Sequence, residues 1–227
     1  MSKGNDLHAK AIKAHEQEQD FLKALKFTDE AIIASGEEGD SGEIAGILGS
    51  RQNIFSHLYD KTQNKNYLIL AKYEAEAAVE IAEKSDTSAA LPYRDLAKAY
   101  EQLNDYPNAV TYLEKAINSK LPDSHNRPAV KAEIKAHLAY TKYKAGDKSG
   151  MNLMNEAIAE LENAKEDKYN KDVWLSGAHM RTAEMLKEDN LDLAKEHLRK
   201  AKEIIDVNNE LKLRAEQWKE LAKDFNG

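Results

Sequence analysis

The sequence predicts an all-α fold made of helical hairpins, and three observations support this. Only four prolines and ten glycines occur in 227 residues. The commonest filler residues are Ala, Glu, Lys and Leu, which lose little conformational freedom in a helix. β-Branched runs bounded by turn residues do not occur, and short polar breaks separate segments of helical length. We therefore expect helices joined by short loops.

A spacing of small residues repeats along the chain and predicts where the hairpins lie. In residues 95–117, Ala109 and Ala116 are seven residues apart with Leu113 between them. Such positions share one helix face, so a neighbouring helix can approach closely. The spacing recurs at Ala24, Thr28 and Ala31, at Ala71, Ala75 and Ala78, at Gly150, Met154 and Ala157, and at Ala194, Leu198 and Ala201. Each copy is predicted to be the second helix of a hairpin.

The elements follow in order from these copies and from the polar breaks. We expect hairpins at about 6–35, 42–85, 88–119, 127–165 and 171–206, all within a single domain of residues 1–227. The last segment, 209–225, places an apolar stripe opposite charged residues, and its members are Leu211, Ala215, Trp218, Ala222 and Phe225. A stack of repeats leaves its last apolar face uncovered, so this segment is predicted to be a capping helix.

The third hairpin resembles a known repeat most closely. Its first helix carries Tyr93, Leu96, Ala97 and Tyr100, a turn follows at Asn104 and Asp105, and Tyr106 precedes Ala109. This stretch resembles the tetratricopeptide repeat, which implies a right-handed α-solenoid of about five hairpins. Successive copies are 47, 38, 41 and 44 residues apart, against a family period of about 34. Repeats lengthened in this way are similar to those of kinesin light chains and bacterial peptide-sensing regulators, although no helix-turn-helix module precedes them here.

Charge and composition limit the partners and the compartment. The chain has 33 basic and 40 acidic residues, a net charge of −7, and no long block of one sign. We therefore expect neither nucleic acid nor a membrane surface as a partner. Cysteine is absent, the N-terminal segment lacks the apolar core of a signal peptide, and the most apolar run covers only residues 67–71. These features predict a cytoplasmic protein.

The sequence contains no short motif of catalysis or metal binding. Zinc-protease, phosphate-loop, nucleophile-elbow and EF-hand patterns are all missing, and a cysteine nucleophile is excluded by composition. The seven histidines are scattered, and each is expected to be a surface or half-buried helix residue. We predict a protein that is not an enzyme and needs no cofactor or metal. An enzyme with a site assembled between repeats stays open as an alternative.

The resemblance implies a binding surface, because the first helices of tetratricopeptide hairpins line a concave groove. The positions that match the groove are candidates for binding an extended segment of a protein or peptide: Asn53, His57, Arg94, Lys98, His137, Tyr140, Tyr143 and His179. The carboxylate clamp of chaperone-binding members is absent, since Ala9, Lys13, Ile47, Leu91 and Asp95 occupy its positions. We predict a protein interaction module, with a peptide-sensing regulator as an alternative.

Overall fold

The computed structural model describes residues 2–85, 87–122 and 125–225, which contain eleven α-helices and no strand. The chain divides into two compact units, Met1–His125 and Asn126–Gly227, called here the N-terminal and C-terminal units. The predicted all-α fold is confirmed. None of the helices among the described residues is both long and apolar enough to cross a membrane.

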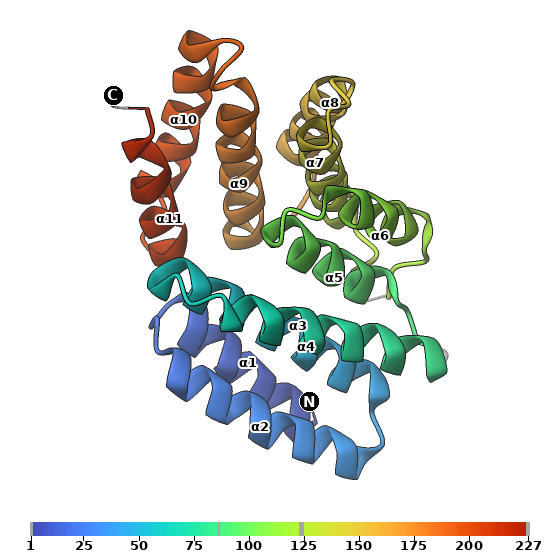
Figure 1. The fold of residues 1–227 in the computed structure, drawn as a ribbon. Coiled ribbons are helices and arrows are strands. Elements are labelled where there is room, and N and C mark those ends of the chain that lie inside the picture. Colours follow the sequence, from blue (N-terminus) through green and yellow to red (C-terminus); the bar gives the residue numbers. More distant parts are fainter. Residues whose placement is uncertain (1, 86, 123–124, 226–227) are drawn as a thin grey trace. The chain divides into compact units, whose positions relative to one another are not determined.

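The N-terminal unit consists of three hairpins. They are formed by α1 (Lys3–Glu16) with α2 (Phe21–Glu38), α3 (Ser41–Thr62) with α4 (Asn66–Lys84), and α5 (Ala90–Gln102) with α6 (Tyr106–Asn118). The second helix of each of the first two hairpins also packs on the first helix of the next hairpin, α2 against α3 and α4 against α5, and Figure 1 shows the resulting order. The first helices of the hairpins, called A helices below, meet as well: α3 contacts both α1 and α5.

The C-terminal unit contains two hairpins and the last helix. Its hairpins are α7 (Pro128–Lys144) with α8 (Gly150–Asn163) and α9 (Lys168–Leu186) with α10 (Leu191–Asp206). Helix α11 (Lys212–Lys223) packs on α9 and α10, and Trp218 Nε1 donates a hydrogen bond to the Leu198 carbonyl at 2.8 Å. The predicted C-terminal capping helix is therefore present (Figure 1).

The repeated small residues form the core of the hairpins. All fifteen positions of the five copies are buried, and Ala24, Ala71, Ala109 and Ala194 have no exposed surface. The packing prediction is confirmed at each of them. At Gly150 the two helices of a hairpin approach closely, because an added Cβ would lie 2.3 Å from the Ala139 carbonyl oxygen.

The turns use the residues that the sequence pattern singles out. Asp20 and Asp105 cap α2 and α6, each accepting a hydrogen bond from the backbone N–H three residues later. Asn104 and Gly146 take positive φ values of 60° and 99°, which Gly and Asn tolerate best. Together, the positive-φ residues and the N-terminal caps allow one helix to end and the next to begin within a few residues.

The tyrosines of the third hairpin are half-buried. Tyr93, Tyr100 and Tyr112 pack against the cluster of Ala75, Val79 and Leu96, and the rings of Tyr100 and Tyr112 stack with centroids 5.6 Å apart. The Tyr93 hydroxyl donates to the Glu83 carboxylate at 2.6 Å, so this tyrosine packs its ring against the cluster while its oxygen has a polar partner.

Candidate functional site

Two neighbouring A helices of the N-terminal unit bring the candidate side chains together. Lys98 on α5 donates to Oδ1 of Asn53 on α3, with 2.6 Å between the atoms, and both residues are half-exposed. Since this bond uses the Asn53 oxygen, the side-chain NH₂ is the end that can donate to a bound group. Arg94, Lys98, Asn53 and His57 are called the N-terminal A-helix face below.

Asp95 lies buried beneath this face and organises its charges. Arg94 donates to Oδ1 of Asp95 from Nε at 2.9 Å and from a terminal guanidinium nitrogen at 2.7 Å, and the Lys98 ammonium lies 4.0 Å from the same oxygen. Gly49 on α3 leaves room for this carboxylate, because an added Cβ would lie 2.5 Å from Asp95 Oδ2. Asp95 thus offsets part of the positive charge, so the face is suited to recognition by hydrogen bonds as much as by charge.

His57 is joined to a buried histidine of the first hairpin. Its Nδ1 lies 2.8 Å from Nε2 of His15 on α1, at hydrogen-bonding distance. Burial lowers the pKa of His15 to about 4, and the positive charges of Lys98 and Lys61 act in the same direction. His15 is therefore neutral at pH 7. The two imidazole rings form one of the contacts between α1 and α3.

Two candidates of the C-terminal unit are buried. His137 on α7 is 3% exposed, and its Nε2 lies 2.7 Å from the Arg181 guanidinium and 3.2 Å from the Glu133 carboxylate. His179 on α9 is 4% exposed, and its Nδ1 lies 3.0 Å from Nδ1 of His197 on α10. Both rings make contacts inside the unit, so a partner could reach them only if helices separated.

The two candidate tyrosines of α7 are half-buried and hydrogen-bonded. Tyr140 bonds to Glu184, whose pKa is raised mainly by burial. The Tyr143 hydroxyl donates to Asp189 in the turn before α10 and accepts from Lys148 at 2.7 Å. The structure thus places both tyrosines in contacts that link the α7–α8 hairpin to α9 and the turn that follows it.

Sequence reasoning missed the buried polar residues behind the N-terminal A-helix face. Besides His15 they include Gln52, which donates to Ser56 at 2.8 Å, and Ser56, which donates to the half-buried Gln102 at 2.5 Å. His15 and His57 are 42 residues apart, whereas the small residues of the first two copies are 47 residues apart. The repeat spacing in the sequence therefore gave no signal for this pair.

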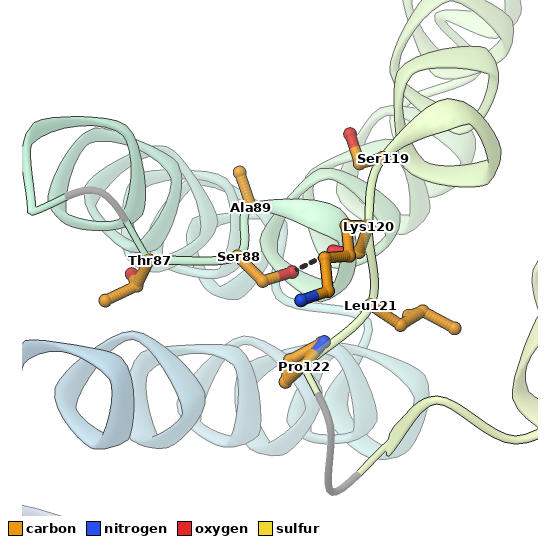
Figure 2. A pocket seen from close by; sticks show the side chains of 7 residues that line it. All are labelled: Thr87, Ser88, Ala89, Ser119, Lys120, Leu121 and Pro122. Atoms are coloured by element: carbon orange, nitrogen blue, oxygen red, sulfur yellow. Dashed lines mark hydrogen bonds between the residues drawn. The ribbon is translucent and has the colours of Figure 1, made fainter.

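Metal-binding clusters and cavities are the places where catalytic groups gather. No group of three or more His, Cys, Asp or Glu side chains that could hold a metal ion occurs among the described residues. A cavity of about 500 Å³ lies between the loop before α5 and the segment after α6, where Ser88 donates to the Lys120 carbonyl at 2.6 Å (Figure 2). Its lining is Thr87, Ser88, Ala89, Ser119, Lys120, Leu121 and Pro122, which includes no carboxylate or histidine. This set lacks the paired groups of general acid–base chemistry.

Comparisons with solved structures connect the fold to tetratricopeptide-like repeats. BtubC (BKLC) from P. vanneervenii is 21% identical with a TM-score of 0.61, covering 89% of this chain and 80% of that chain. A putative kinesin light chain from Podosopora anserina with nearly identical TPR-like repeats is 15% identical with a TM-score of 0.53, covering 88% and 93%. No protein-family model and no curated protein matches the chain. The predicted tetratricopeptide-like helical repeat fold is confirmed.

Proposed function

We propose that the chain is a non-catalytic protein interaction module whose N-terminal A-helix face binds an extended segment of a partner protein. We also propose that it acts in the cytoplasm. The observation that carries the proposal is the Lys98–Asn53 bond. The bond joins two A helices and engages the oxygen of Asn53. The NH₂ of this half-exposed side chain is then the end that can donate to a partner. An extended segment has backbone carbonyl groups that accept such bonds along its length.

The chemistry of the face favours a segment with carboxylates and accessible carbonyls. Arg94 and Lys98 donate and never accept, and Asn53 has its oxygen already engaged. Nucleic acid would bring many phosphates against a chain of net charge −7. We therefore propose a protein partner and neither nucleic acid nor a membrane.

The alternatives make different demands on the same residues. A peptide-sensing regulator would need to change its conformation when the segment binds. This requires two conformations that differ in their affinity for the segment. An enzyme would need converging acid–base groups near a cavity. The interaction module requires only the face itself, and this is why we favour it.

A pair of double variants tests the proposal. The Asn53→Ala, Lys98→Met variant removes two donors of the face but keeps most of the aliphatic stem of Lys98. The matched control is Lys26→Met, Glu30→Ala, which changes two exposed residues of α2. Partners are recovered from a lysate with the parent chain, and their dissociation constants are then measured by fluorescence anisotropy.

We expect the face variant to bind at least about 10-fold more weakly, since each lost hydrogen bond to a charged or amide donor is worth about 1 kcal/mol or more. The control should bind within about twofold of the parent. Equal affinity of a correctly folded face variant would remove these residues from the binding site. Steady turnover of a small substrate by the purified chain would refute the non-catalytic assignment.

A further inference from the structure

Two histidine pairs join helices within the units, and three of their four rings are buried, whereas His57 is half-buried. In the N-terminal unit, His15 of α1 is 4% exposed and meets His57 of α3, with 2.8 Å between ring nitrogens. In the C-terminal unit, His179 of α9 and His197 of α10 are 4% and 9% exposed and meet at 3.0 Å. Both pairs therefore place a single hydrogen bond between two titratable rings inside a packed helix interface.

Such a bond depends on the number of protons in the pair. Two neutral imidazoles form it when the N–H of one ring donates to the bare nitrogen of the other, and a singly protonated pair can still form it. When both rings are protonated, two N–H groups face each other and two positive charges lie within a few ångströms. Double protonation therefore converts an attractive contact into a repulsive one.

We propose that these two histidine pairs are acid-sensitive contacts, and that protonation of both rings of a pair separates the helices it joins, α1 from α3 and α9 from α10. The proposal goes beyond the binding function and does not depend on any partner. It assigns a role to His15 and His197, which the N-terminal A-helix face does not use.

The surroundings of the first pair oppose the charged state. The ring of Phe21 from α2 lies edge-on to His15, with centroids 5.4 Å apart, and offers no counter-charge. Lys61 from α3 and Lys98 from α5 are cations, and both lower the pKa of His15 below what burial alone produces. His15 therefore takes up a proton only when the pH is well below the usual range of histidine.

The second pair has a similar but less uniform environment. Burial lowers the pKa of His179 to about 4, with further contributions from His197 and from Lys200 on α10. Burial and Lys200 lower the pKa of His197, whereas Glu196 acts in the opposite direction. The balance again disfavours protonation in the folded unit.

The sign of the pH effect follows from linkage. A folded pKa below the ordinary value of 6.5 means that the unfolded chain binds more protons at acidic pH. The stability contribution is thus complete above pH 6.5 and is lost as the pH falls towards about 4. For His15 or His179 alone, the unfolding equilibrium constant should rise about 30-fold between pH 7.5 and pH 5.

Variants that keep the hydrogen bond but cannot titrate separate this effect from the carboxylates. His15→Gln with His57→Asn places an amide near each bonded ring nitrogen, and His179→Asn with His197→Asn does the same for the second pair. His125→Gln, at an exposed histidine, is the matched control. Urea unfolding is followed at pH 7.5 and pH 5.0. Tryptophan fluorescence reports on the C-terminal unit, which contains both Trp174 and Trp218, and amide exchange of peptides from α1 and α3 reports on the N-terminal unit.

We expect the acid-induced rise of the unfolding constant to shrink by about 30-fold in each double variant, in its own unit, and to stay unchanged in His125→Gln. A pH dependence equal to that of the parent in both double variants would overturn the proposal. Where a double variant does not fold, ¹⁵N NMR of the parent decides: rings that stay neutral in the folded chain down to about pH 5 support the proposal, and rings that titrate near pH 6.5 refute it.

Discussion

Gly150 is the position at which one added methyl group should cost most. In the other four copies the equivalent residue is Ala24, Ala71, Ala109 or Ala194, so a sequence comparison alone would judge Gly150→Ala to be harmless. The structure predicts the opposite, because α8 begins at Gly150 directly against the backbone of α7.

The size of the effect follows from three distances. The added Cβ would lie 2.3 Å from the Ala139 carbonyl oxygen, 2.8 Å from the Tyr143 backbone nitrogen and 3.1 Å from the Tyr143 Cβ. Two of these atoms belong to a helix backbone and cannot rotate away, so α7 and α8 must separate by about 1 Å to restore normal contact distances. Overpacking of this kind costs about 1–3 kcal/mol. The gain in helix propensity from Gly to Ala, at most about 1 kcal/mol, is reduced at a helix end. We expect a net loss of about 1–2 kcal/mol.

The measurement is urea unfolding monitored by tryptophan fluorescence and circular dichroism. Trp174 packs against the cluster that contains Met154 and Ala157 of α8, so its emission follows the affected interface. Gly36→Ala on α2 is the matched control, because nothing lies within 4 Å of its added Cβ. That variant should be as stable as the parent or up to about 1 kcal/mol more stable. If Gly150→Ala is as stable as the parent, the close approach of α7 and α8 is wrong.

Two further substitutions test the packing of the hairpins. Ala116→Leu fills a site that is 1% exposed and should lower the free energy of unfolding by about 1–3 kcal/mol; unchanged thermal unfolding would place α6 in a different register. Trp218→Phe removes the hydrogen bond to the Leu198 carbonyl and should cost about 0.5–1.5 kcal/mol, seen as faster amide exchange in α11, whereas unaltered exchange would mean that this bond does not hold the capping helix.

The sequence was sufficient to predict the hairpins because their packing is local and periodic. Ala109, Leu113 and Ala116 lie on one face of one helix, and the partner helix follows after a short turn. The spacing of these residues along the sequence was therefore sufficient to predict the hairpin. The same reasoning located the turns, since Asp105 and Asn104 are suited to their backbone conformations wherever they occur.

The contacts between hairpins were harder to predict because they depend on register across repeats. His15 looked like an isolated histidine, yet it meets His57, and Gln19 meets Lys61 at the same separation of 42 residues. This offset is set by helix and loop lengths that differ from one repeat to the next. A single sequence with unequal repeat steps does not define it, so the buried pairs could be recognised only in the structure.

The candidate binding residues fall into two groups for a related reason. The pattern of the resemblance marks positions on A helices, but exposure also depends on the neighbouring helix. Asn53 and Lys98 are half-exposed, while His137 and His179 are covered by contacts with Arg181 and His197. The assignment of a partner to these positions stays a prediction.

The central claim is that a partner segment lies on the A helices of the N-terminal unit, and site-specific photo-crosslinking tests it most directly. A photoreactive phenylalanine replaces Lys13, an exposed residue of α1, or Lys26, an exposed residue of α2, and crosslinked peptides of the recovered partner are identified by mass spectrometry. The account predicts one defined partner segment crosslinked from position 13, lost when Asn53→Ala and Lys98→Met are added, and little product from position 26. Equal crosslinking from both helices, or crosslinking from position 13 that survives the double substitution, would contradict it.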